Sequence, residues 1–339
     1  MAGYESTKRT VVVRTEQLVE VRTDLEWWAN RYPIFNRARL PALALTLAAH
    51  LADRPRANRS LMGLLSLWIA AFDELVDQDW LTSSALHELA DRCKAAVGGV
   101  ARDTYYSSHS SCSRLRIALS SGEQLLCALD ELRLRLMALE PEITLAGYWQ
   151  DTFGRMIDGI IVQRELGASL YAGISDQPAS EPPILLSADI PAYDVLMGTL
   201  QHSIGVPHYL ATCFLTYRDP ELADRLPSLL PAVEACAKAV RLANDLRSWR
   251  RDIRERNVNM LVAATAAISR SEPGLSASEC QERALHQLSK RLAIHVAEVH
   301  SLLNASHRPD GAAERGLVRL VDVVTGVYAS HDYHTWQPN

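Results

Sequence analysis

Between Pro55 and Pro141 the chain contains no proline. This stretch is rich in leucine, alanine, arginine and glutamate, which have high helix propensity, so it permits several long helices. Its apolar residues recur at three- and four-residue spacing, as in Leu61, Leu64, Leu65, Trp68, Ile69 and Phe72. Strand-like alternation is confined to one short candidate, Thr10 to Val13. The pattern therefore predicts an all-α fold.

The same periodicity predicts the positions of individual helices. We expect helices near 36–53, 58–79, 83–104, 115–139, 142–169, 189–217, 230–255, 276–304 and 313–331. Two segments rich in Gly, Ser, Asp and Pro, 172–183 and 304–311, are expected to be loops. Neither loop is long enough to be an interdomain linker, and the composition does not change across them. We predict an N-terminal segment over 1–24, partly flexible, followed by one helical domain over 25–335.

Composition excludes several classes of protein. The 339 residues are 48% hydrophobic and 22% charged, which is typical of a globular protein and excludes wholesale disorder. With 35 basic and 40 acidic residues the net charge is −5, so we expect no nucleic-acid partner. The six cysteines include no C-x-x-C pair and predict reduced thiols rather than a zinc site or disulfide framework.

We find no signal-peptide pattern at the N-terminus. The apolar stretch Leu40–Ala52 is short and contains Thr46 and His50, which predicts a buried helix rather than a membrane span. We therefore expect a soluble, cytoplasmic protein, and we allow for a homodimer.

A first acidic segment lies at the end of a strongly apolar predicted helix, in the sequence FDELVD. Asp73 and Asp77 are four residues apart, so their carboxylates lie on one helix face, which Ile69 continues toward the N-terminus. Paired carboxylates repel each other unless a cation neutralises them. A hard divalent cation such as Mg²⁺ prefers oxygen ligands and would do so. The alternative is an ordinary solvated helix end.

A second segment, NDLRSWRRD, lies within the helix predicted over 230–255. Asn244, Ser248 and Asp252 follow one another at intervals of four residues and therefore form one stripe. Their amide, hydroxyl and carboxylate oxygens form a donor set suited to Mg²⁺ with open positions for phosphate. Arg241, Arg247, Arg250 and Arg251 surround the stripe and favour a polyanionic ligand. The alternative is that the three polar residues are merely exposed. Together the two segments predict a diphosphate held between two helices by Mg²⁺ ions.

With these two segments, the chain resembles the class I terpene synthases. FDELVD resembles their aspartate-rich motif DDxx(D/E), and NDLRSWRRD resembles their second metal motif (N/D)Dxx(S/T)xxx(E/D). The resemblance extends over roughly 25–335. It implies a helical barrel around an apolar cavity, in which Asp73 and Asp77 hold Mg²⁺ on one wall and Asn244, Ser248 and Asp252 on the other. It also implies three Mg²⁺ ions and a contact between Arg251 and the diphosphate.

Three departures from the family pattern stand out, the third of which is a pair of missing arginines. Glu74 occupies the second acidic position, and Asp252 stands where glutamate is commoner. The arginine that bacterial relatives usually have about 46 residues before the second motif is missing from 198–205, so Arg241, Arg247 and Arg164 are the candidates for contacting the diphosphate in its place. The usual terminal Arg-Tyr pair corresponds to Asp332-Tyr333, which retains Tyr333 as a substrate-binding candidate.

The segments DGIIVQRE and SHDYH resemble bacterial diterpene synthases, which implies geranylgeranyl diphosphate as substrate and a cyclic hydrocarbon or alcohol as product. The expected cavity residues are Ile69, the aromatic residues Phe72, Trp149, Tyr209 and Tyr328, and His202 and His208 as candidate bases. For the aromatic residues and histidines the alternative is plain core packing. Gly205 and Pro207 are expected to break the helix over 189–217 and expose backbone carbonyls.

Two further functions remain open from the sequence. A chain-elongating prenyl diphosphate synthase would have the same fold, although it would normally have a second aspartate-rich motif where this chain has Asn244 and Ser248. A non-catalytic helical binding protein would make both oxygen-rich stripes incidental. A class II cyclase is excluded, because Asp77-Gln78-Asp79-Trp80 lacks the D-x-D-D acid motif.

Overall fold

The computed structural model describes residues 15–77, 81–99, 113–171, 191–306, 308, 311–331 and 333. These residues form α-helices joined by short connections, and no strand occurs among them. The helices are α1 (Thr15–Arg31), α2 (Leu40–His50), α3 (Arg56–Asp77), α4 (Ser83–Val97), α5 (Ser113–Met137), α6 (Ile143–Leu170), α7 (Tyr193–Ser203), α8 (Val206–Tyr217), α9 (Leu222–Glu255), α10 (Met260–Ser271), α11 (Ala277–Asn304) and α12 (Ala312–Ser330), with a 3₁₀ turn η1 (Arg37–Arg39) before α2. The predicted all-α class is confirmed.

Most predicted helices are present with shifted ends. The helix predicted over 189–217 is two helices, α7 and α8, separated at Ile204 and Gly205. The helix predicted from 230 begins earlier, at Leu222, because α9 accommodates Pro227 and Pro231 within its N-terminal part. The candidate strand Thr10–Val13 and the loop predicted over 172–183 lie outside the described residues. The division at 24 and 25 stays a prediction, although α1 crosses it.

Two helices were not predicted. Helix α1 buries Val21, Leu25 and Trp28, which recur at helical spacing and pack it against α2 and α3. Helix α10 begins after Asn259, whose side chain accepts hydrogen bonds from the backbone N–H groups of Leu261 and Val262 at 2.8 and 3.3 Å. Such an N-cap satisfies donors that a helix start otherwise leaves without partners.

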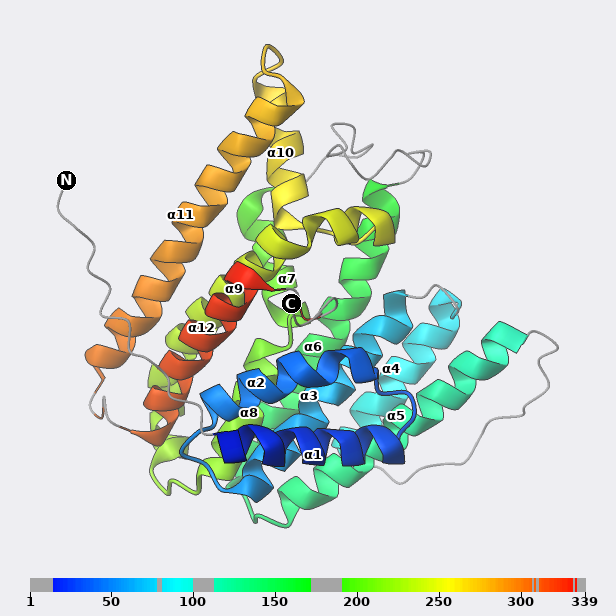
Figure 1. Ribbon diagram of the computed structural model, residues 1–339, viewed down its shortest axis with the longest axis vertical. Helices are drawn as coiled ribbons and strands as arrows, with labels where there is room; N and C mark the ends of the chain where they lie inside the picture. Colours follow the sequence, from blue (N-terminus) through cyan, green and yellow to red (C-terminus); the bar gives the residue numbers. More distant parts are fainter. Residues whose placement is uncertain are drawn as a thin grey trace.

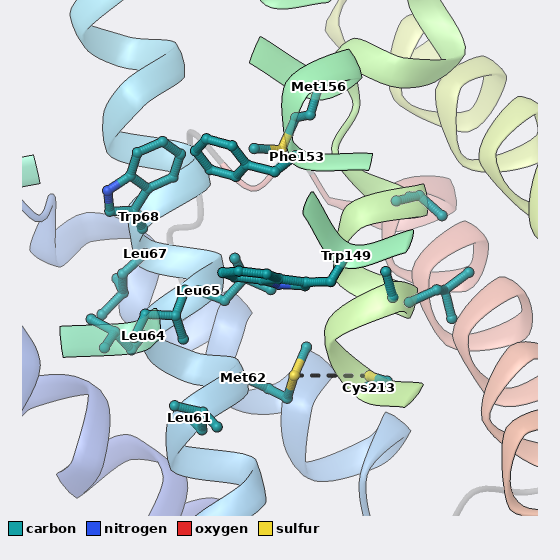
Figure 2. Packing of buried hydrophobic residues seen from close by; sticks show 14 of the residues in the cluster. Leu61, Met62, Leu64, Leu65, Leu67, Trp68, Trp149, Phe153, Met156 and Cys213 are labelled. Carbon is teal, nitrogen blue, oxygen red and sulfur yellow. Dashed lines mark hydrogen bonds between the residues drawn. The ribbon is translucent and has the colours of Figure 1, made fainter. Parts of the chain in front are cut away.

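Helices α9, α11 and α12 lie side by side, and α12 also contacts α2 and α8 (Figure 1). Helix α9 lies against α11 and α12, while α6 packs on α7 and α8 and α3 packs on α1 and α5. The core between α3, α6 and α8 is aromatic: Trp68 stacks on Phe72 with ring centroids 5.3 Å apart, and Phe153 lies 5.4 Å from Trp68. Figure 2 shows Trp149 reaching from α6 toward α3 in this core.

The described cysteines, Cys93, Cys127, Cys213, Cys236 and Cys280, form no disulfide with one another, and the Sγ atom of Cys213 lies 3.9 Å from the sulfur of Met62 (Figure 2). Among the described helices, none combines the length and the apolar character needed to cross a bilayer.

Candidate active site

A cavity with about 1160 Å³ of empty space, part of it open to solvent, lies between α2, α3, α6, α8, α9 and α12. Its lining changes character along α3 and α9. On α3 the lining residues run from Ser66 and Ile69 to Asp73 and Asp77, and on α9 from Val240 to Asn244 and Asp252. The C-terminal halves of both helices therefore present oxygen donors to the cavity. The remaining wall is largely apolar, with Leu43, Leu47, Val206, Leu320 and Val324 among its residues.

The acidic face of α3 lines the cavity as the spacing predicts. Burial raises the pKa of Asp73, although the charges of Arg39, Arg251 and Arg241 oppose this shift. Burial and the neighbouring carboxylate of Asp73 raise the pKa of Asp77 to about 8, although a hydrogen bond with Asn257 lowers it. Ionising both carboxylates is therefore unfavourable in the protein alone, and a bound cation would reduce that cost.

Glu74 has a different partner. Its Oε1 atom accepts hydrogen bonds from Arg39 Nε at 2.6 Å and from Asn36 Nδ2 at 3.1 Å. It does not line the cavity, and the ion pair instead connects α3 to the turn before α2. This arrangement explains how the chain tolerates glutamate at the second acidic position of FDELVD.

The second stripe lies on α9. Asn244 and Asp252 line the cavity, whereas Ser248 is buried beside it and donates its hydroxyl proton to Asp252 Oδ2 at 2.5 Å. Asn259 Nδ2 donates to the same oxygen at 2.7 Å. Arg251 Nη2 donates to the other oxygen, Oδ1, at 3.2 Å. The Asp252 carboxylate is therefore oriented from three sides.

The two oxygen-rich faces lie close enough to affect each other's ionisation. The charge of Asp252 on α9 contributes to raising the pKa of Asp77 on α3. The charges of Arg241 and Arg251 on α9 act in the opposite direction on the pKa of Asp73. Since all of these residues also line one cavity, the structure brings the two sequence segments together.

The donor set fits a hard divalent cation. Among the described residues no group of three or more His, Cys, Asp or Glu side chains forms a ready-made metal cluster. The available ligands are instead carboxylate, amide and hydroxyl oxygens divided between α3 and α9. An all-oxygen set of this kind suits Mg²⁺, which keeps open positions for water and phosphate oxygens.

Arg241 lies at the cavity wall but is almost fully engaged. It is 3% exposed and forms an ion pair with Asp245 at 2.9 Å. Its Nη1 donates to Gln163 Oε1 at 2.7 Å and to Ser203 Oγ at 3.1 Å. Its guanidinium therefore lies beside the 198–205 segment that lacks an arginine.

Arg164 and Arg247, which the sequence also offered in place of the missing arginine, lie away from the cavity. Arg164 Nη2 donates to the Leu81 carbonyl at 3.2 Å, and Arg164 does not line the cavity. Arg247 is exposed on the outer side of α9. Arg251, in contrast, lines the cavity with Arg241, and Arg39 is a third cation there.

The break between α7 and α8 also reaches the cavity. Gly205 adopts a left-handed conformation with φ of +75°, and Ser203, Ile204, Gly205 and Val206 all line the wall. A side chain at Gly205 would lie 3.2 Å from Ile69. Because Pro207 has no N–H, the Ser203 carbonyl lacks its usual helical donor. The predicted role of Gly205 and Pro207 in breaking the helix agrees with this geometry.

Several predicted cavity residues are instead part of the core. Phe72 and Trp149 are fully buried, and the indole of Trp149 donates to Thr212 Oγ1 at 3.0 Å. His208 is buried between Trp149 and Phe153, and His202 lies outside the lining. For Phe72, Trp149 and His208, which lie where α3, α6 and α8 pack together, core packing is therefore the better description.

Ile69, Gly205, Tyr209, Tyr328 and Tyr333 do line the cavity. Tyr333 lies near the described C-terminus, where its hydroxyl is 2.6 Å from Thr46 Oγ1. Asp332 lies outside the described residues.

Sequence reasoning missed four polar residues, Arg39, Gln163, Asn257 and Asn259. Arg39, Gln163 and Asn257 line the cavity, and Asn259 supports Asp252 from behind it. A signal existed only for Asn259, which precedes an apolar run in the manner of an N-cap. The remaining three carry no such local pattern.

Comparisons with known proteins agree with this architecture. Residues 186–293, which include the second oxygen-rich stripe, match the family described as terpene synthase family 2, C-terminal metal binding. Together with the fold and the cavity, this match supports a class I terpene synthase, an enzyme with Mg²⁺ as its cofactor.

Individual proteins are similar to this chain over nearly its whole length. The ent-pimara-9(11),15-diene synthase of Streptomyces sp. (strain KO-3988) is 23% identical over 321 residues, covering 94% of this chain and 92% of that protein. The 2-methylisoborneol synthase of Streptomyces coelicolor A3(2), solved in complex with Mg²⁺ and 2-fluoroneryl diphosphate, has a similar fold with a TM-score of 0.67 at 14% identity. That match covers 97% of this chain and 96% of the other. Hedycaryol synthase in complex with nerolidol is also similar, with a TM-score of 0.62, 14% identity and 93% and 94% coverage.

Proposed function

We propose that this terpene synthase ionises geranylgeranyl diphosphate and cyclises it to a terpene hydrocarbon or alcohol, with release of inorganic diphosphate. The observation that supports the proposal best is the division of one cavity into two chemically different parts. Oxygen donors and arginines from α3 and α9 gather in one part, and aliphatic and tyrosine side chains line the rest. Such a cavity suits a ligand with a diphosphate head and a long apolar tail.

In this proposal Asp73 and Asp77 hold Mg²⁺ from α3, while Asn244, Ser248 and Asp252 hold it from α9, with three ions in all. When bound, Mg²⁺ would neutralise the diphosphate and stabilise it as a leaving group. Ser248 would release its hydrogen bond to Asp252 to serve as a ligand. Arg251 and Arg241 would bind the diphosphate oxygens, with Arg241 held in place by Asp245 and Gln163.

The apolar wall would then determine how the allylic cation folds and reacts. Its side chains would exclude water from the cation and fold the substrate tail into a reactive shape. They include Ile69, Leu43, Val240 and Val324. The rings of Tyr209 and Tyr328 offer negative π-faces to passing cationic centres. The Ser203 carbonyl, which has no helical donor, adds a negative dipole at the cavity wall.

One comparison favours a twenty-carbon substrate. The curated relative that matches 94% of this chain is a synthase of a pimaradiene, a hydrocarbon product. The solved neighbour binds a neryl diphosphate analogue, which supports a prenyl diphosphate as the substrate class.

The proposal is tested by incubating purified protein with the ten-, fifteen- and twenty-carbon prenyl diphosphates, with Mg²⁺ or with EDTA. We expect Mg²⁺-dependent diphosphate release and an extractable cyclic product, strongest with geranylgeranyl diphosphate, detected by mass spectrometry. Consumption of added isopentenyl diphosphate with longer diphosphates as products would assign chain elongation instead. No diphosphate release from any of the three would leave only a binding role.

A variant pair makes this test specific for the site. Asn244→Ala removes one proposed Mg²⁺ ligand from the cavity. It should lower turnover by about 10²-fold or more, because loss of a single group that stabilises developing charge commonly has an effect of that size. Asn304→Ala changes an exposed residue at the end of α11 and should leave turnover intact. Equal activity of the two variants would contradict the proposed role of Asn244.

A further inference from the structure

The cavity wall contains a phenol that is hydrogen-bonded to a buried base. Tyr209 of α8 lines the cavity, and its hydroxyl lies 2.9 Å from His50 Nδ1. His50 is the last residue of α2, is 1% exposed and does not line the cavity itself. The pair therefore leads from the cavity wall into the protein interior.

The proton positions in this pair follow from a third group, which His50 contacts on its other side. His50 Nε2 lies 3.0 Å from the backbone carbonyl oxygen of Gly316 on α12. Because a carbonyl only accepts hydrogen bonds, Nε2 must bear the ring proton and Nδ1 must present its lone pair. The Tyr209 hydroxyl consequently donates to Nδ1, and its oxygen retains lone pairs that can accept a proton.

A second phenol in the cavity provides an informative contrast. The hydroxyl of Tyr333 is bonded to Thr46 Oγ1 at 2.6 Å, and Thr46 in turn donates to the Ala42 carbonyl at 3.0 Å. Tyr333 therefore donates to Thr46, and this series ends at an amide carbonyl that does not take up a proton near neutral pH. The series through Tyr209 ends at an imidazole nitrogen that does.

We propose that Tyr209, backed by His50, is the proton acceptor that ends the cation cascade, so that the product is an olefin rather than an alcohol. A C–H bond next to the final cationic carbon breaks, and its electron pair forms the new C=C bond. The proton moves to the Tyr209 oxygen as the hydroxyl proton of Tyr209 passes to His50 Nδ1. The resulting imidazolium donates through Nε2 to Gly316 and returns the proton to solvent through Tyr209 after the product leaves. This inference rests on the proposed cyclase function.

The electrostatics of His50 agree with this role. Burial lowers the pKa of His50 to about 4, so the imidazole is neutral near pH 7 and free to accept a proton. An alkyl carbocation is a far stronger acid than an imidazolium, so proton transfer to this weak base is still favourable. The nearby charges of Arg319 and Arg54 favour the neutral ring, while Asp53 favours the charged one.

The test uses two variants and follows both diphosphate release and the product mixture. Tyr209→Phe keeps the ring but removes the hydroxyl. His50→Gln keeps both hydrogen bonds, since an amide accepts from Tyr209 and donates to Gly316, but it cannot be protonated near neutral pH. For both variants the product mixture is compared at equal amounts of diphosphate released. We expect the ratio of the wild-type olefin to other products to fall about tenfold or more, because general-base contributions are typically about 10²–10⁴-fold.

Tyr217→Phe is the matched control. Tyr217 is a buried phenol on the same helix that does not line the cavity, so its loss should leave the product mixture unchanged. If the pair were only a structural link between α2, α8 and α12, His50→Gln would reproduce the wild-type mixture, and this result would overturn the proposal. A wild-type product consisting only of alcohol would overturn it as well. Absence of diphosphate release from the wild-type enzyme would instead contradict the proposed function.

Discussion

Asp252 owes part of its orientation to a residue outside both oxygen-rich segments. Asn259 donates one hydrogen bond to Asp252 Oδ2 at 2.7 Å and another to the backbone carbonyl of Asp245 at 2.9 Å. Its oxygen at the same time caps α10. One buried amide thus fixes a proposed metal ligand to the start of the next helix, an arrangement in which supporting residues typically affect metal affinity about 10–100-fold.

We predict that Asn259→Asp weakens Mg²⁺ binding by about 10–100-fold while it keeps α10 capped. Aspartate preserves the capping oxygen but loses the donor and places a second carboxylate beside Asp252. Isothermal titration of the protein with Mg²⁺ and inorganic diphosphate measures the effect. Thr82→Ala removes the N-cap of α4, costs about 1 kcal/mol of stability and should leave the affinity unchanged. If both variants bound Mg²⁺ like the wild type, Asn259 would have no positioning role.

At the scale of the helix, the interruption between α7 and α8 places its residues in the cavity wall. Gly205 allows the interruption because its φ of +75° is favourable only for glycine, and because Ile69 leaves little space for a side chain. Pro207 then starts α8 at a position where its missing N–H costs nothing. Two local residues therefore shape the wall of the site.

We expect Gly205→Ala to lower the free energy of unfolding by about 1–3 kcal/mol, the usual cost of holding a residue with a side chain in the left-handed region. Urea denaturation measures it. Gly198→Ala is the control, because a methyl group at Gly198 in α7 meets no atom within 4 Å and should stabilise the helix by about 0.5–1 kcal/mol. Similar gains for both variants would show that the left-handed conformation of Gly205 imposes no constraint.

At the scale of the molecule, the proposed metal site opposes folding when no cation is bound. The pKa of Asp77 lies near 8 in the folded protein, above the ordinary value of 3.8, so the folded state holds a proton that the unfolded chain has lost. Stability from this group is complete below about pH 4 and is lost as pH rises to about 8. Asp73 acts in the same direction, because burial also raises its pKa.

Accordingly, the metal-free enzyme should lose stability between about pH 4 and 8, by up to about 1.4 kcal/mol per pH unit from Asp77. Asp77→Asn should flatten this dependence, whereas Glu88→Gln, a change at an exposed position of α4, should not. Thermal denaturation in EDTA at several pH values measures the slopes. Mg²⁺ with inorganic diphosphate should raise the melting temperature most at the alkaline end. Parallel slopes for the wild type and Asp77→Asn would contradict the assignment.

The sequence alone determined the fold class, most of the helices, and the spacing of Asp73 and Asp77 and of Asn244 and Asp252. These features are local: helix propensity and three- to four-residue periodicity depend on neighbours within one or two turns. The break at Gly205 was equally predictable, because glycine and proline act through their own backbone.

Only the tertiary structure decided which side chains share the cavity. Trp149 and Phe72 have the aromatic character expected of the wall, yet the packing of α3 on α6 and α8 buries them in the core. His50 and Tyr209 are 159 residues apart, and no local sequence pattern around either residue predicts their contact. Their hydrogen bond exists because α2, α8 and α12 meet, and such a meeting is set by the packing of the whole chain rather than by any segment of it.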